Sequence, residues 1–353
     1  MSQEVPMESK SRIVIFDYLR VILAFFVVAI HADTITSSPS NYLGGTSWWL
    51  AATINSLGRV SVPLFIMLSG ALALNPISKV KTTSSILQRL GIPLLFWTAC
   101  YYLWNVFYLH NSFSYSVGHL YYLFIALGLG LVTPYLRNHP NLLRIRYGLI
   151  LLGISISIDI IHFLTGWGNF FFSMPILWTL YLGYYILGFS WQYKISQIIA
   201  YLSILFLAVC GAYSLYIGNW SNIHGSSAWW IVPAGNYYWS HFAPNIVISV
   251  IAIWSMVNSL RFRIGNLSIN RLVASLGSAT YGIYLVHPFV LGFMERQLGF
   301  ETHLVTGNLA LYYIVKIFVA LVLSYGLISV LKLTRVGSII LGDILQTKNK
   351  KLS

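Results

Sequence analysis

Long runs of apolar residues alternate along this chain with short polar breaks that contain glycine or proline. A helix needs about 20 apolar residues to cross a bilayer core of about 30 Å. Runs of about that length begin near the N-terminus and follow one another almost to the end of the chain. They lie at 13–32, 51–75, 91–110, 118–136, 147–165, 174–191, 198–217, 241–258, 276–296 and 309–331. The pattern predicts an all-α fold, a polytopic membrane helix bundle of about ten transmembrane helices.

The composition agrees with this pattern and excludes a soluble domain. Of the 353 residues, 57% are hydrophobic and 8% are charged, whereas about a quarter of the residues in soluble domains are charged. No internal repeat or linker divides the chain, so we expect one membrane domain over 1–353 with a short basic tail, 332–353. The two cysteines, Cys100 and Cys210, lie in apolar runs, so the sequence predicts neither a disulfide framework nor a metal site.

Topology explains the net charge of +13. All but four of the 21 lysines and arginines fall on one side of the predicted bundle, the side that holds both termini. The exceptions are Arg20, Arg59, Arg296 and Lys316. Because positive residues favour the cytoplasmic side, we expect both termini in the cytoplasm and a multi-pass protein of the plasma membrane. The basic residues form no exposed cluster, which argues against nucleic acid as a partner.

The first apolar run carries three ionisable residues, Asp17, Arg20 and His31. At 100° per residue, Arg20 lies about 60° from Asp17, and His31 lies about 20° from Arg20, so the three share one helix face. An ionisable side chain inside the bilayer costs roughly 3 kcal/mol, which favours a functional role. The alternative is structural: Asp17 and Arg20 form an i,i+3 ion pair near the helix end, and His31 lies in the far interface.

Two arginines near the ends of later runs are further candidates. Arg59 lies close to the outer end of the second run, where a buried guanidinium needs a partner such as Asp33 or a substrate. Snorkelling to the interface is the alternative. Arg89 precedes Pro93 at the start of the third run. Positive charge beside helix N-terminal amides suits a phosphate, although the positive-inside rule also places an arginine there.

Histidines and tyrosines occur together in two later runs. His119 opens the fourth run, and Tyr284 and His287 share a helix face at i,i+3 in the ninth. A lone intramembrane histidine is more often a hydrogen-bonded structural residue than a catalyst, so the sequence leaves the role of His287 open. The outer loop 218–240 is rich in tryptophan and tyrosine, which indicates an interfacial aromatic belt or a sugar-stacking surface.

Taken in order, these motifs resemble those of the membrane-bound acyltransferase 3 family. More narrowly, the chain is similar to the branch that O-acetylates bacterial surface polysaccharides. The resemblance extends from the first run to about residue 330. It is carried by Arg12, Asp17, Arg20, His31, the stretch 62–70, Arg89, Pro93, the stretch 119–134 and the stretch 282–288.

The resemblance implies an O-acyltransferase that moves an acyl group, expected to be acetyl, from cytoplasmic acyl-CoA to a hydroxyl of a surface or lipid-linked polysaccharide. By position, His31 matches the family's catalytic histidine, Arg20 the arginine before it, and Arg89 the arginine that meets the acyl donor. Gln88 and Gly91 flank Arg89 at a place where family members often have a second arginine. The implied partners are acetyl-CoA, the bilayer, a glycan acceptor and polysaccharide synthesis machinery.

The chemistry of O-acyl transfer assigns these residues the same roles as the resemblance does. O-acylation needs a base for the hydroxyl proton, and a neutral His31, which shares a helix face with Asp17 and Arg20, can supply it. The donor's phosphates need positive charge on the cytoplasmic side, which Arg12, Arg20 and Arg89 provide. Along an α-helix, His31 lies about 16 Å from Arg20, a length that an extended pantetheine arm can bridge.

Other polar residues complete the expected site, and two other functions stay open. The candidates for contacting the substrate or the oxyanion are Arg59, His119, Tyr284 and His287. Buried charges also line transport pathways, so a transporter or flippase for a glycan or its lipid-linked precursor is the alternative. A purely structural subunit of a polysaccharide synthase is a third possibility.

Overall fold

The computed structural model describes residues 14–36, 42–78, 82–108, 118–191, 193, 195–224, 237, 240–260, 267–300 and 307–343. Within these residues the chain forms helices and turns, without strands. Three predictions fall outside them: the role of Arg12, most of the aromatic loop 218–240, and the solvated basic end from Thr347 to Ser353.

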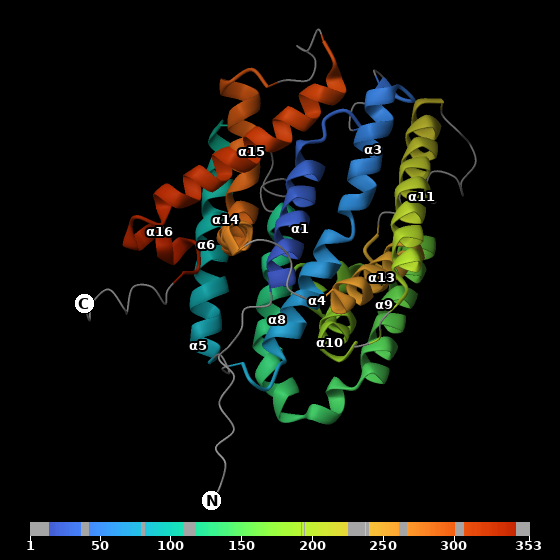
Figure 1. The fold of residues 1–353 in the computed structure, drawn as a ribbon, viewed down its shortest axis with the longest axis vertical. Helices are drawn as coiled ribbons and strands as arrows, with labels where there is room; N and C mark the ends of the chain where they lie inside the picture. Colours follow the sequence, from blue (N-terminus) through green and yellow to red (C-terminus); the bar gives the residue numbers. More distant parts are fainter. Residues whose placement is uncertain are drawn as a thin grey trace, which may run out of the picture.

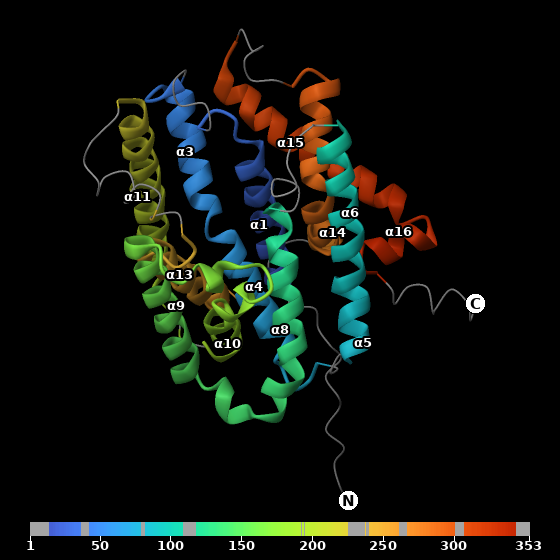
Figure 2. The same ribbon diagram turned by 180° about the vertical axis from the view of Figure 1, so that it is seen from behind.

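Most of the long helices run roughly along the long axis of the molecule, whereas α15 (Leu309–Leu331) crosses them obliquely, and α1 (Val14–Ala32) lies in the middle of the bundle (Figure 1 and Figure 2). The other long helices are α3 (Thr46–Gly58), α4 (Ser61–Ala73), α6 (Ile92–Leu103), α8 (Tyr121–Asn138), α9 (Ile145–Thr165), α11 (Gln197–His224), α14 (Leu267–Gln297) and α15 (Leu309–Leu331). The shorter ones are α5 (Thr83–Ile86), α10 (Leu182–Ser190), α13 (Pro244–Ser259) and α16 (Arg335–Ile340). Irregular turns are η1 (Leu87–Gly91) and η2 (Trp104–Tyr108), both π-helical, and η3 (Gly118–Leu120), η4 (Pro140–Leu143), η5 (Asn169–Phe172) and η6 (Leu177–Thr179), all 3-10.

Among the described residues, eight helical segments are long and apolar enough to cross a membrane. They match eight of the ten predicted runs, with α3 and α4 together forming one broken span. The runs at 174–191 and 241–258 instead contain the short helices α10 and α13. In α10, residues 183–188 are all buried by neighbouring helices. Hydropathy reports only that these residues are apolar and does not distinguish burial in protein from contact with lipid, so it predicted a full span here.

Glycines set how closely α10 packs against its neighbours. A Cβ on Gly70 of α4 would lie 1.9 Å from the carbonyl oxygen of Tyr185, and a Cβ on Gly188 would lie 1.9 Å from that of Met67. On the other side, a Cβ on Gly183 would lie 2.6 Å from the backbone nitrogen of Leu152 in α9. Only glycine permits such backbone contact between helices, and this contact holds α4 and α9 together through α10.

The first helix packs along α14 in the same direction. Neither glycine nor proline interrupts α1, so it stays regular for its whole length. The side chain of Asp17 faces Gly277, where a Cβ would come within 3.1 Å of it, and the hydroxyl of Tyr18 donates to Asn270 (3.2 Å). We call the side of the bundle on which α1 begins and α4, α8 and α15 end the terminal side.

The last described residues pack back onto the bundle. The region expected to be a tail from residue 332 onward contains α16, and Trp97 Nε1 of α6 donates to the carbonyl of Ile340 (3.0 Å). Gly342 has a φ of 72°, a left-handed conformation that favours glycine. A Cβ at that residue would lie 2.6 Å from the carbonyl oxygen of Arg89, so this segment closes against η1.

Candidate active site

A cavity of about 1050 Å³ runs inside the bundle along α1, from Arg20 to His31. Its other walls come from α4, the first turns and the far end of α8, η1, α14 and the segment after α15. Ile77, one of the lining residues, is 80% exposed, so the cavity opens at the terminal side. Its inner end lies next to the last turn of α1.

The cavity gathers most of the predicted site residues. The ones that line it are Arg20, His31, Arg59, Arg89, His119 and Tyr284. Two more lie directly behind its wall: Asp17 is bound to Arg20, and the ring of His287 contacts the ring of His31. Arg12 lies outside the described residues.

The orientation of His31 suits a base. Its Nδ1 lies 2.8 Å from the carbonyl oxygen of Val27, one helical turn back. Since a carbonyl only accepts, Nδ1 carries the hydrogen, and the neutral ring keeps its lone pair on Nε2. The side chain is exposed to the cavity although it lies within the bundle. A proton donor that enters the cavity can therefore reach it.

Three histidine rings lie close together at this end. The centroid of the His287 ring lies 4.8 Å from that of His31 and 6.4 Å from that of His119, edge to face in both cases. His287 donates from Nδ1 to the carbonyl of Ile283 (3.0 Å), and the buried Nε2 atoms of His287 and His119 find no hydrogen-bond partner among the residues that the structure describes. Unpartnered buried nitrogens are costly and uncommon in purely structural histidines. Among the described residues, no group of three or more His, Cys, Asp or Glu is arranged to hold a metal ion.

A proline in α14 shapes this cluster. Pro288 has no N–H to give, and the next amide, Phe289, points to the hydroxyl oxygen of Tyr101 (3.4 Å). That hydroxyl donates in turn to the carbonyl of Leu285 (2.8 Å). Tyr101 thus replaces a helical hydrogen bond, and its ring lies 4.2 Å from that of His119. One tyrosine therefore contacts both the segment of α14 that holds His287 and the ring of His119.

Arg59 has the kind of partner that its burial requires. Its Nε and one terminal nitrogen both donate to Asn55 Oδ1 (3.1 and 2.9 Å), and Asn55 Nδ2 donates to Asp33 (2.9 Å). Asp33 also accepts from the amides of Ile35 and Thr36. This chain of contacts supports the predicted link to Asp33 and directs Arg59 into the cavity rather than toward the interface.

Tyr284 has a structural contact of its own. Its hydroxyl donates to the carbonyl of His119 and so fixes η3, the turn from which α8 begins. The first residues of α8 lie below the upper end of α6 in Figure 2. His119, which precedes them, lies inside the bundle, where its ring contacts those of Tyr101 and His287.

At the terminal side, Arg20 and Arg89 occupy the wider part of the cavity. Arg20 makes the predicted i,i+3 ion pair with Asp17 at 2.6 Å, so the structural alternative holds for this pair while Arg20 still faces the cavity. Arg89 lies in the π-helical turn η1, four residues before Pro93. Because Pro93 cannot donate to the carbonyl of Arg89, that carbonyl accepts from the hydroxyl of Tyr281 instead (3.4 Å). π-helical turns of this kind often occur at functional sites.

Sequence reasoning missed several residues of the cavity. His241 reaches it from the segment before α13, where its Nδ1 contacts the Tyr181 hydroxyl (2.5 Å) and its carbonyl accepts from Tyr184 (2.7 Å). Arg137, at the end of α8, makes four hydrogen bonds to the turn at 73–78. Lys332 pairs with Asp343 at 2.8 Å. Only the positive charge of Arg137 and Lys332 was visible in the sequence, because these contacts join segments far apart along the chain.

The comparisons with known proteins agree with the motifs. A family model described as an acyltransferase domain, that of the acyltransferase 3 family, matches residues 13–329. No curated protein and no solved structure matches the chain. The matched residues include α1, α4, α8 and α14, all of which line the cavity. The chain therefore belongs to the acyltransferase 3 family of membrane proteins.

Proposed function

We propose that this protein is a plasma-membrane O-acetyltransferase that moves an acetyl group from cytoplasmic acetyl-CoA to a hydroxyl of a surface or lipid-linked polysaccharide. The observation that carries the proposal is the cavity itself, which joins cationic side chains at the terminal side to His31 at the inner end. Membership of an acyltransferase family supports acyl transfer in general. The donor, the acceptor and the acetyl group are our proposal.

The donor enters from the terminal side, which we assign to the cytoplasm. Its phosphates lie near Arg20 and Arg89, and its pantetheine arm extends along α1. The eleven residues from Arg20 to His31 span about 16 Å of helix, which matches an extended arm of this kind. The thioester then lies beside the histidine cluster.

The transfer itself needs one base and one set of oxyanion donors. The Nε2 of His31 takes the proton of the acceptor hydroxyl, and the hydroxyl oxygen attacks the thioester carbonyl. The negative charge on the carbonyl oxygen is stabilised by Arg59, which Asn55 and Asp33 hold in place. The carbon–sulfur bond then breaks, and the leaving thiolate takes the proton back from His31. The products are the O-acetyl ester and free CoA.

The proposed partners are the lipid bilayer, the glycan acceptor and the machinery that makes the polysaccharide. The acceptor approaches the inner end of the cavity from the side opposite the donor, so the two substrates meet at His31. No step in this scheme uses a metal ion or nucleic acid.

The test is release of free CoA from acetyl-CoA by purified protein in proteoliposomes, with and without a candidate polysaccharide. We expect acceptor-dependent release that falls by about 10²- to 10⁴-fold in His31→Ala, the usual contribution of a general base. His139→Ala is the matched control, since His139 is an exposed histidine outside the cavity.

Full activity of His31→Ala at equal protein amounts would contradict the mechanism. Movement of glycan across the vesicle membrane without acetyl-CoA, and without CoA release, would favour the transporter.

A further inference from the structure

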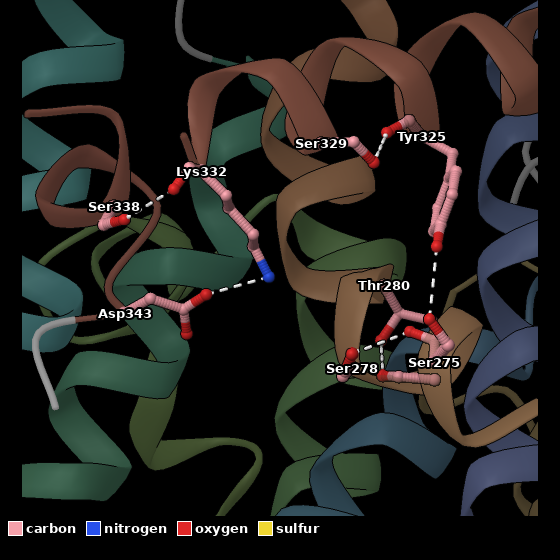
Figure 3. A network of polar contacts seen from close by, with 9 residues as sticks. Ser275, Ser278, Thr280, Tyr325, Ser329, Lys332, Ser338 and Asp343 are labelled. Atoms are coloured by element: carbon pink, nitrogen blue, oxygen red, sulfur yellow. Dashed lines mark hydrogen bonds and ion pairs between the residues drawn. The ribbon is translucent and has the colours of Figure 1, made fainter. Parts of the chain in front are cut away.

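The wall of the cavity at its terminal side includes a segment beyond the region that the family model matches. That match ends at residue 329, whereas Lys332, Leu341, Gly342 and Asp343 all line the cavity. Figure 3 shows this segment folding back so that Asp343 faces the ammonium group of Lys332. The chain thus adds its own C-terminal piece to the donor end of the cavity.

Several contacts fix this segment, which we call the C-terminal strap (residues 332–343). Thr334 caps α16 by accepting from the amide of Gly337 (2.9 Å), and Ser338 donates to the carbonyl of Lys332 (3.4 Å), a contact drawn in Figure 3. The Trp97 indole holds the carbonyl of Ile340. Gly342 lies directly on the backbone of Arg89. The strap therefore places Lys332 and Asp343 at the same end of the cavity as Arg89.

The cations at this end differ in how firmly they are held. Arg20 is paired with Asp17, whose side chain is 1% exposed, and Arg137 makes its four bonds to the turn at 73–78. Arg89 makes no side-chain ion pair or hydrogen bond within the described part of the chain. Lys332 is held by Asp343, and both side chains are about 30% exposed, at 29% and 32%.

An ion pair exposed to this degree contributes little to stability. A phosphate carries more negative charge than a carboxylate and offers more acceptor oxygens, so it competes well for an ammonium group in such a pair. Among the cations described at this end of the cavity, Arg89 and Lys332 are therefore the two whose present contacts leave them most able to bind a new anion.

We propose that Lys332 and Arg89 form a subsite for the phosphate groups of the acyl donor, and that Asp343 is the counter-ion that occupies Lys332 until the donor displaces it. The inference rests on the proposed function, because it concerns the donor of that same reaction. The C-terminal strap then takes part in recognising the donor, and Asp343 competes with the donor phosphates for Lys332.

The two halves of the ion pair give variants with opposite expected effects. Lys332→Gln removes a phosphate contact, so KM for acetyl-CoA rises about tenfold while kcat stays within about twofold. Asp343→Asn removes the competitor, so KM for acetyl-CoA falls by about threefold. Neither variant changes KM for S-acetylpantetheine, a donor that lacks phosphate. Arg335→Gln, which removes an exposed charge outside the cavity, leaves both KM values unchanged.

The measurement is CoA or pantetheine release by purified full-length protein in proteoliposomes, at several fractions of phosphatidylglycerol. The proposal would be overturned if Lys332→Gln did not change the ratio of KM for acetyl-CoA to KM for S-acetylpantetheine while both KM values followed the phosphatidylglycerol content. That result would assign the subsite to lipid phosphate. A rise of KM for acetyl-CoA in both Lys332→Gln and Asp343→Asn would mean a merely structural pair and would also overturn it. In either case the native protein still transfers acetyl, whereas failure of the proposed function shows as no release from either donor.

Discussion

Asp17 and Arg20 show how a buried charge is kept inside this bundle. The carboxylate of Asp17 is 1% exposed, it lies against Gly277, and its partner at 2.6 Å is Arg20. The ion pair with Arg20 helps to stabilise a carboxylate so enclosed, since removing one half of a buried pair is destabilising. The pair thus links the packing of α1 on α14 to the position of a cavity-lining arginine.

We predict that Arg20→Met costs about 3 kcal/mol of stability, because it removes the ion-pair partner at 2.6 Å from the Asp17 carboxylate, whose side chain is 1% exposed. The double variant Asp17→Ala with Arg20→Met is expected to be more stable than the sum of the two single variants by at least about 1 kcal/mol. Thermal unfolding of the detergent-solubilised protein measures all three. Strictly additive losses would show that the two side chains do not depend on each other.

The spacing of residues within one helix explains which site residues the sequence could predict. Asp17, Arg20 and His31 share a helix, so helical periodicity alone places them on one face. The same reasoning cannot find His241 or Asp343, because their partners, Tyr181 and Lys332, lie on other segments that only the tertiary fold brings near. It also left His287 open, and the contact of its ring with that of His31 came only from the structure.

Among the helices, α10 departs most from the sequence prediction. Its nine residues lie in a run that hydropathy assigns to a full span, yet its neighbours are other helices. Two glycines in the sequence of α10 indicate this burial, because Gly183 and Gly188 have no side chain at the points where the backbones of neighbouring helices touch. Hydropathy averages over residues and does not report which side of a helix meets another helix.

We predict that Gly188→Ala destabilises the protein by about 3 kcal/mol, because the added methyl group would overlap the backbone carbonyl of Met67. Gly153→Ala in α9 is the matched control, since a Cβ there meets nothing within 4 Å. The control is expected to be neutral or stabilising by up to about 1 kcal/mol, as alanine is the better helix former. Denaturation in the same detergent compares the two, and equal effects would contradict the close packing of α10.

At the scale of the whole molecule, the sequence predicted the architecture and the family correctly and gave no view of the cavity. Apolar runs report the order of the helices and eight of the ten predicted spans, and motif order reports the family. The cavity arises from the way in which α1, α4, α8 and α14 pack, with the C-terminal strap across one end. That arrangement depends on contacts between distant segments, so no local pattern encodes it.

The orientation in the membrane remains a prediction, based on the distribution of lysine and arginine. In a chain with Cys100 and Cys210 replaced by alanine, we expect Arg144→Cys, between η4 and α9, to be protected from an impermeant maleimide in intact cells. Thr46→Cys, at the start of α3 on the other side, is expected to react there. The pattern reverses in inverted membrane vesicles. Labelling of the first site in intact cells would mean that both termini are outside.

The cavity also has an electrical consequence. It follows α1 from Arg20 as far as His31, the second-last residue of that helix, so the layer of protein between its inner end and the opposite surface is thinner than the whole bundle. A membrane potential then falls mainly across this layer, where moving one elementary charge requires about 2.3 kcal/mol per 100 mV. In the proposed reaction, the phosphates of the donor stay on the near side of the layer, and the acetyl group that crosses it is neutral. Transfer of this kind moves a chemical group through the steepest part of the field without electrical work.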